Sequence, residues 1–235
     1  LFMLVGIGMT LVIKEPDTAA RLPSSLKETV TQPFIDFIKR FGWKPAITAL
    51  CFMFLYKLGD NMATALSTPF YIDLGFELTE IGVVAKSSAL WASIVGGILG
   101  GLWMIKLGIN RALWIFGVVQ VVTILGFAAL SEIGANSWVL AIVISLEYLG
   151  VGLGTAAFTA YIARSTSVAF AATQFALFTA LAALPRTFAN ATTGYIVEAV
   201  GWTDFFLICA VLSLPGMVLL WWLAPWRGDK KIEAV

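Results

Sequence analysis

The chain has 235 residues, of which 60% are hydrophobic and only 12% carry a charged side chain, and its net charge is +1. A soluble domain usually carries about 25% charged residues, so this composition indicates a surface that faces lipid. The near-neutral charge gives no basis for a nucleic-acid partner. The lack of histidine excludes His-ligated metal sites and His-based catalysis, and two cysteines in apolar runs exclude a thiolate metal site or disulfide framework. We therefore expect no metal and no cofactor.

The first 45 residues precede the first predicted membrane helix. Residues 1–13 are apolar but too short to cross about 30 Å of hydrocarbon, so we interpret them as the end of a truncated transmembrane helix. Residues 14–45 are expected to form a central cytoplasmic loop. Within it, Phe34, Phe37 and Phe41 alternate with charged residues, which favours an amphipathic helix at the headgroup level, although a linker with a few apolar residues is an alternative.

Six apolar segments within residues 46–226 are each long enough to span a bilayer as a helix. They are predicted at 46–72, 79–105, 111–130, 137–163, 168–197 and 204–224. Short links join them, so consecutive helices must run antiparallel. The predicted fold class is all-α, a polytopic membrane protein with a six-helix transmembrane half-bundle, followed by a cytoplasmic tail at 227–235.

Twelve of the fifteen basic residues lie in alternate connections between these helices or in the C-terminal tail. The twelve are Lys14, Arg21, Lys27, Lys39, Arg40, Lys44, Lys106, Arg111, Arg164, Arg227, Lys230 and Lys231. The other connections hold acidic residues and neither lysine nor arginine. Because positive charge is retained on the cytoplasmic side of membrane proteins, the long connection and the C-terminus are predicted to be cytoplasmic.

Five charged residues lie inside the predicted spans, at similar depth on four different helices. They are Lys57, Asp60, Lys86, Glu147 and Arg186. Each costs roughly 2.5–3.5 kcal/mol at a helix centre, which a bundle selected for stability alone would avoid. The pattern predicts one water-accessible cavity lined by the first, second, fourth and fifth helices, with the third and sixth outside it. Such a layout is typical of half of a secondary transporter.

The roles of these charges are open to more than one interpretation. Asp60 and Glu147 are candidates for proton coupling. Lys57, Lys86 and Arg186 suit an anionic substrate, Arg186 through its planar bidentate fork. Lys57 and Asp60 are i,i+3 neighbours, so a structural salt bridge between them is an alternative, as is a pair between Arg186 and Glu147.

Three uncharged residues, Asn61, Tyr148 and Trp91, are further substrate-binding candidates. The two aromatic rings could stack on sugars, although helix packing or interfacial anchoring explains them equally. Pro185, beside Arg186, favours a kink or an unwound turn at the depth of the cavity. Close helix packing is predicted at Gly96, Gly97, Gly100, Gly101, Gly150, Gly152 and Gly154.

Residues 55–65, LYKLGDNMATA, together with 69–76, resemble the AmpG-type anhydromuropeptide permeases of the major facilitator superfamily. Shorter stretches at 79–82 and 172–177 are similar to the same family. The resemblance puts the family's intramembrane lysine and aspartate onto Lys57 and Asp60. The superfamily's loop signature at 101–108 has Ile105 at its usual acidic position, which puts a gating salt bridge from this loop in doubt.

The resemblance implies the C-terminal half of a transporter with a 3+3 inverted repeat, completed by an N-terminal six-helix half and monomeric when complete. It implies a lipid-embedded, proton-driven importer of N-acetylglucosaminyl-anhydro-N-acetylmuramyl peptides in the bacterial inner membrane. Peptidoglycan recycling and a link to β-lactamase induction follow from that activity.

Three other functions are alternatives. Another bulky organic anion would suit the same charges as a substrate. A membrane-embedded transferase is disfavoured because the charges lie at mid-depth and histidine is absent. A channel or scaffold is disfavoured by mixed-sign charges with no ring motif. The chain is therefore predicted not to be an enzyme.

Overall fold

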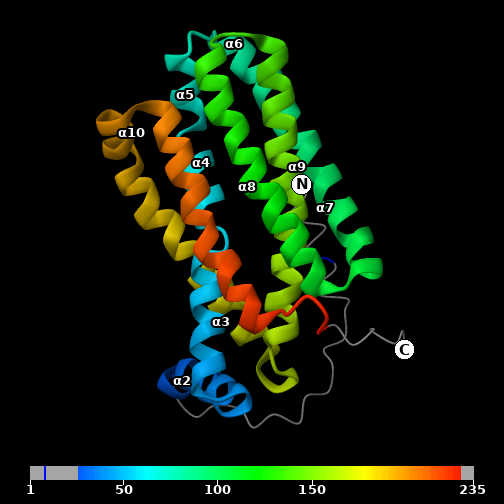
Figure 1. Cartoon of the computed structure of the whole chain (residues 1–235). Coiled ribbons are helices and arrows are strands. Elements are labelled where there is room, and N and C mark those ends of the chain that lie inside the picture. Colours follow the sequence, from blue (N-terminus) through cyan, green and yellow to red (C-terminus); the bar gives the residue numbers. More distant parts are fainter. Residues whose placement is uncertain (1–7, 9–25, 229–235) are drawn as a thin grey trace.

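A computed structural model describes Gly8 and residues 26–228. The predictions for residues 1–13 and for the end of the tail, 229–235, fall outside these residues, Gly8 apart. The described chain is helical apart from short links, and it contains no strand in residues 26–228. The long helices lie alongside one another in a bundle, which confirms the predicted all-α membrane fold (Figure 1).

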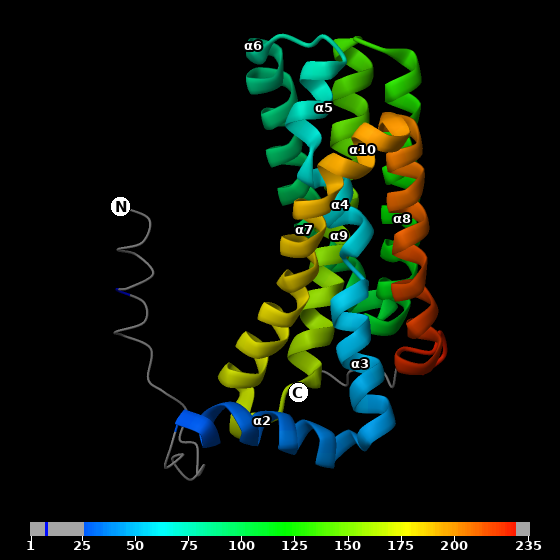
Figure 2. The ribbon, with the colours of Figure 1, turned by 90° about the vertical axis from the view of Figure 1, so that its left-hand side faces the viewer.

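The first described helix, α2 (Leu26–Phe41), lies across the lower end of the bundle, nearly perpendicular to the other helices (Figure 2). Its Phe37 is buried against Phe178, with ring centroids 4.8 Å apart. Gln174, which is fully buried, donates a hydrogen bond of 2.9 Å to the carbonyl oxygen of Pro33. Aromatic packing and this hydrogen bond therefore hold α2 against the start of the fifth membrane segment. Its position in the headgroup layer stays a prediction.

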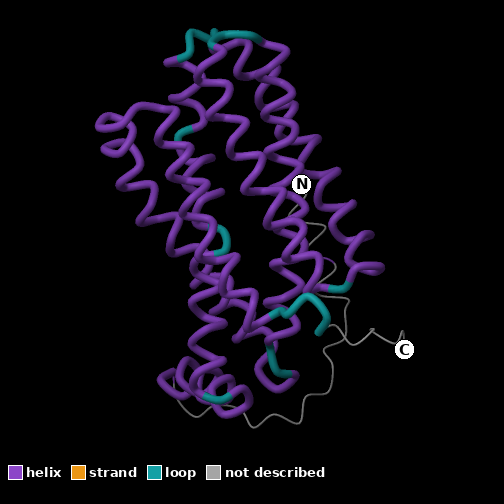
Figure 3. Tube along the Cα trace, viewed as in Figure 1, coloured by secondary structure: helices purple, strands orange, loops and turns teal. Residues whose placement is uncertain are grey.

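The first membrane segment is interrupted twice, where a single helix was predicted at 46–72. Its parts are α3 (Trp43–Leu55), α4 (Leu58–Ala65) and α5 (Ser67–Asp73). The breaks fall at Tyr56–Lys57 and at Leu66, and both are drawn as loop in Figure 3. Pro69 explains the second break, because a proline ring clashes with the carbonyl group four residues before it and lacks the N–H that would bond to it.

The other membrane segments follow the predicted order. They consist of α6 (Leu78–Glu80), the π-helical turn η1 (Ile81–Ala85), α7 (Lys86–Leu107), α8 (Ile109–Ile133), α9 (Ser137–Ser165), the short η2 (Val168–Phe170) and α10 (Ala171–Leu223).

The long α10 is two helices that meet at Gly201. The φ of Gly201 is 81°, a left-handed value that glycine adopts without strain, and it separates the fifth membrane segment from the sixth. No residue of α10 except Gly201 has non-helical backbone angles, so the unwound turn expected at Pro185 is absent.

Helices α7 and α9 approach closely through glycines. A Cβ atom at Gly96 would lie 2.3 Å from the carbonyl oxygen of Leu149, and one at Gly152 would lie 2.5 Å from that of Ser93. These glycines therefore allow backbone-to-backbone packing, as predicted. Gly101 differs, because a Cβ there would meet no atom within 4 Å.

Two apolar clusters form the core, one above the other in the orientation of Figure 1. The upper core includes Phe70, Phe127 and Phe206, and the lower core includes Phe52 and Phe116. Polar residues mark the boundary between the clusters on four membrane segments. They are Lys57 between α3 and α4, Gln120 on α8, Glu147 on α9 and Ser213 on α10. A polar layer therefore divides the core at mid-depth.

Substituting Gly96 by alanine tests the α7–α9 contact. The new methyl group would collide with the Leu149 carbonyl, and we expect a loss of about 1–3 kcal/mol in the free energy of unfolding. Gly101→Ala is the matched control on the same helix, because its methyl group meets no neighbour in this chain. Unfolding of the purified complete protein in detergent measures both. Equal stability of the two variants would contradict the close approach.

Candidate functional site

The polar layer is centred on an ion pair between Lys57 and Asp60. Lys57 Nζ lies 2.6 Å from Asp60 Oδ2, and the two residues are only 9% and 4% exposed. Lys57 occupies the break between α3 and α4, and Asp60 lies in the first turn of α4, where the helix dipole favours an acidic side chain. The local chain path therefore brings the two charges together, as the i,i+3 spacing suggested.

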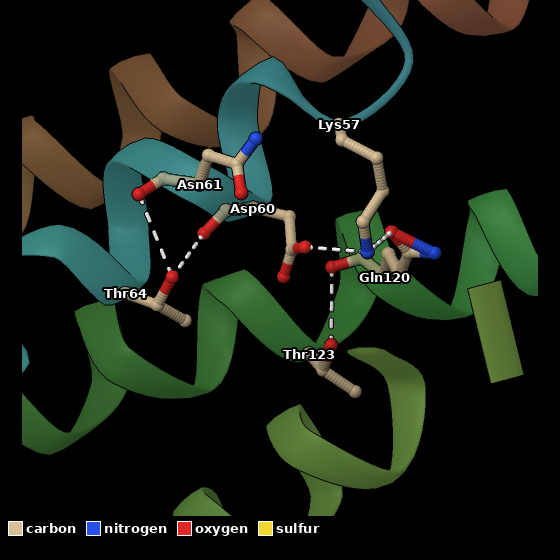
Figure 4. A network of polar contacts seen from close by, with 6 residues as sticks. All are labelled: Lys57, Asp60, Asn61, Thr64, Gln120 and Thr123. Atoms are coloured by element: carbon tan, nitrogen blue, oxygen red, sulfur yellow. Dashed lines mark hydrogen bonds and ion pairs between the residues drawn. The ribbon is translucent and has the colours of Figure 1, made fainter. Parts of the chain in front are cut away.

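A second helix supplies a further hydrogen-bond acceptor to Lys57. Its Nζ donates a hydrogen bond of 3.2 Å to Gln120 Oε1 on α8 (Figure 4). Gly154 on α9 makes room for this amide, because a Cβ there would lie 1.5 Å from Gln120 Nε2. The third membrane helix thus takes part in the polar layer, although none of its residues lines the groove beside the ion pair, as predicted for a helix outside the cavity.

Glu147 on α9 is the most deeply buried charged residue of this layer, at 1% exposure. Asp60 and Thr123 lie close to it, and neither of its carboxyl oxygens has a hydrogen bond of normal geometry to a described residue. Asp60 Oδ1 and Gln120 Nε2 likewise lack a partner among the described residues. An unpaired buried charge is costly, and binding a proton at this carboxyl would remove that cost. The pair between Glu147 and Arg186, open from the sequence, does not form.

An open groove of about 250 Å³ runs beside the ion pair. Three of the predicted substrate-binding residues line it: Lys57, Asn61 and Arg186. Phe158, Thr159, Ile162, Thr179, Ala182 and Ala183 complete its walls. The groove therefore offers two cations, an amide, two hydroxyl groups and an aromatic ring to a ligand.

The remaining candidates lie elsewhere. Lys86 is exposed at the start of α7, where its Nζ donates to Thr68 Oγ1 at 3.3 Å. Trp91 is 66% exposed and lines a different groove, with serines of α7 and α9. Tyr148 is half-buried against the upper core, within electrostatic reach of Glu147 and Arg186. The structure therefore does not bring all five intramembrane charges to one cavity.

Sequence reasoning missed Gln120 and Gly154 as parts of this layer. Both carried a signal, since an amide inside an apolar span needs a partner and the glycines of α9 indicated close packing. Neither signal named Lys57 as the partner. No group of three or more potential metal ligands occurs among the described residues.

Comparison with known proteins assigns the fold to a family. The family model of the Major Facilitator Superfamily matches residues 46–234. The chain belongs to this superfamily. Its members are transporters rather than enzymes, and the six-helix bundle and its mid-depth polar layer conform to that architecture.

The chain is 39% identical over 212 residues to the anhydromuropeptide permease of Escherichia coli strain K12, a match that covers 90% of this chain and 43% of the relative. It is 47% identical over 244 residues to an uncharacterized protein of Haemophilus influenzae, covering 97% of this chain and 56% of that protein. The chain therefore spans about half the length of these relatives. The family resemblance noted in residues 55–76 is confirmed.

Removing one partner of the buried pair should destabilise the fold more than removing both partners. Asp60→Leu leaves the Lys57 ammonium buried without its carboxylate, and we expect a loss of about 3–5 kcal/mol in the free energy of unfolding. The double variant Lys57→Met/Asp60→Leu should regain most of this stability. Denaturant unfolding of the complete protein in detergent compares them. If the double variant is no more stable than the single one, the two charges do not depend on each other.

Proposed function

We propose that the complete protein is a proton-coupled secondary transporter that imports anhydromuropeptides across the bacterial inner membrane for peptidoglycan recycling. The observation that carries this proposal is the buried Lys57–Asp60 pair, with Glu147 behind it and a cationic groove in front of it. The relative named as an anhydromuropeptide permease supports the substrate class. A link to β-lactamase induction would follow from import of such peptides.

In this proposal the chain is the C-terminal six-helix half, and an N-terminal half completes the binding site. Lys106, Arg111 and Arg164 lie at the lower end of the bundle in Figure 1, whereas Glu77 and Glu132 lie at the opposite end. This separation supports a cytoplasmic C-terminus. The complete transporter would act as a monomer in the bilayer.

The groove suits one end of a muropeptide better than the whole molecule. Its volume of about 250 Å³ is below the roughly 300–1,000 Å³ of pockets that enclose small ligands. Arg186 can hold a peptide carboxylate through two parallel hydrogen bonds, with Lys57 as a second cation. Asn61 and the hydroxyls of Thr159 and Thr179 can bond to amide or sugar groups. The remaining contacts would come from the other half.

Proton coupling follows from the position of Lys57 between the groove and the two acids. With a proton on Glu147, Lys57 balances Asp60 alone. When Glu147 loses its proton, two carboxylates share one ammonium, and Lys57 is drawn away from the groove. Substrate binding and proton release therefore act on the same side chain in opposite directions. Such a differential interaction is what couples two binding events.

Glu147→Gln tests the proton site. The amide keeps the shape of the side chain but cannot release a proton, so uphill accumulation should be lost while counterflow exchange of substrate persists. Uptake and exchange of labelled anhydromuropeptide are measured in cells that lack their own permease. Glu198→Gln, an exposed acid, is the control and should behave as wild type. Wild-type uptake that is insensitive to a protonophore would rule out proton coupling.

Asp60 is distinguished from Glu147 by the same assay. If Asp60 serves to balance Lys57, Asp60→Asn should lose exchange as well as accumulation, because an unbalanced Lys57 no longer keeps its position. Retained exchange with lost accumulation would instead assign the transported proton to Asp60.

Arg186→Lys tests the bidentate contact with a substrate carboxylate. Lysine keeps the charge but not the planar fork, so we expect binding of anhydromuropeptide to weaken about tenfold, which corresponds to the loss of one charge-assisted hydrogen bond. Competition against labelled substrate gives the affinity. Lys86→Gln should have little effect, because Lys86 lies outside the groove. Equal losses in the two variants would place the carboxylate elsewhere.

A further inference from the structure

The chain makes a fixed turn after α10, at the lower end of the bundle (Figure 1). Three side chains at the start of α8 hold three successive carbonyl oxygens of this turn. Trp114 Nε1 donates to Ala224 at 2.9 Å, Asn110 Nδ2 to Pro225 at 3.3 Å, and Arg111 Nε to Trp226 at 3.2 Å. Asn110 is itself buried and accepts a hydrogen bond of 2.7 Å from Arg164. The turn is therefore built to a defined shape.

This turn forms the rim of a groove of about 450 Å³ between α8 and the end of α10. Its lining residues are Trp114, Trp221, Pro225, Trp226 and Arg227. Three indole rings thus surround a space with one cation at its edge. Arg111, tied to the same turn, adds a second positive charge close to that edge.

A second, wholly apolar depression of about 420 Å³ continues the groove along α10. It shares Trp114 and Trp221 with the first and extends to Leu214, past Met217 and Val218. The ten residues from Leu214 to the end of α10 at Leu223 span about 14 Å along the helix axis. This length is close to half of the 30 Å hydrocarbon core, the depth of one leaflet.

We propose that this continuous groove is a binding site for an anionic phospholipid of the leaflet at the basic end of the bundle. One acyl chain lies along Trp114, Trp221 and Val218, and the phosphate lies at Arg227. The indole rings occupy the interface between the two, the depth at which tryptophan is enriched in membrane proteins.

The charge and the shape of the groove favour this occupant over others. An arginine at an interfacial groove attracts an anionic headgroup, and no acidic side chain lines either depression among the described residues. Trp221 and Trp222 are 74% and 67% exposed in this chain, a large apolar surface that requires lipid or a partner. The groove combines a cation at the headgroup level with an apolar surface as long as one leaflet is deep. This combination suits a lipid with a charged headgroup better than it suits a peptide.

The test uses the complete protein, purified in detergent and stripped of lipid. Tryptophan quenching by brominated phosphatidylglycerol is compared with quenching by brominated phosphatidylcholine of the same chain length. Phosphatidylglycerol should bind about tenfold more tightly. Arg227→Gln should remove this preference while leaving phosphatidylcholine unchanged. Lys106→Gln, an exposed cation at the same end but outside the groove, should retain it.

Val218→Phe fills part of the apolar groove without adding a tryptophan to the fluorescence signal and should weaken both lipids. Gel filtration and thermal unfolding confirm that each variant is folded. Equal affinity of the two lipids in wild type would overturn the proposal. Equal losses in Arg227→Gln and Lys106→Gln would reduce it to a general surface charge and overturn it too. Competition by soluble glycerol phosphate would mean a free-anion site without an acyl chain. Because no step of this test measures uptake, its result is independent of the transport proposal.

Discussion

The structure depends on burying a lysine and two acids at mid-depth in an apolar bundle. Each ion taken from water into such an interior costs several kcal/mol even after the protein relaxes. The Lys57–Asp60 contact of 2.6 Å and the hydrogen bond from Lys57 to Gln120 offset part of that cost. The path of the backbone allows both contacts. The break between α3 and α4 places Lys57 outside either helix and Asp60 in the first turn of α4.

The packing of the surrounding helices is organised by this polar layer. A Cβ at Gly59 would lie 2.0 Å from Ser213 Oγ and 2.2 Å from the carbonyl oxygen of Cys209, so α4 and α10 meet almost backbone to backbone. Gly154 makes the equivalent space for Gln120. Small residues next to Lys57 and Asp60 thus allow polar backbone groups and short side chains of neighbouring helices to approach these two charges. The two apolar cores on either side supply the packing energy that the layer itself lacks.

Much of this fold could be predicted because a bilayer imposes simple constraints. Hydropathy located the membrane segments, and the distribution of lysine and arginine distinguished the basic end of the bundle from the acidic end. The i,i+3 spacing of Lys57 and Asp60 made the ion pair one of the alternatives, because both residues lie on one segment. The break at Tyr56–Lys57 was missed because neither residue disfavours a helix, whereas the break at Leu66 follows from the local signal of Pro69. Pro185 shows the reverse case, because its local signal favours a kink or an unwound turn and yet its backbone angles are helical.

The site was harder to predict than the fold, because the depth of a residue in the membrane does not determine the direction in which its side chain points. Lys86 and Glu147 lie at comparable predicted depth, yet Lys86 is exposed beside Thr68 while Glu147 is enclosed by the bundle. Helix rotation decides this difference, and rotation depends on which faces pack together. Gln120 belongs to the site for the same reason, although its helix carries no charged residue at mid-depth.

The energetic cost of the buried pair argues for a role beyond stability. Apolar residues of similar volume commonly replace a buried ion pair with equal or greater stability, so packing alone gives no reason to keep Lys57 and Asp60. Lys57 is the one residue of the layer that reaches both the carboxyl groups and the groove. A ligand changes a conformational equilibrium only through a difference in its free energy between the two states, and Lys57 can supply that difference. In the proposed transport cycle, a substrate carboxylate in the groove would compete with Asp60 for a single ammonium group, whereas a proton on Glu147 would leave that ammonium available to the substrate. On this proposal, the energetic cost of the pair is the means by which binding in the groove changes the proton affinity of a buried acid.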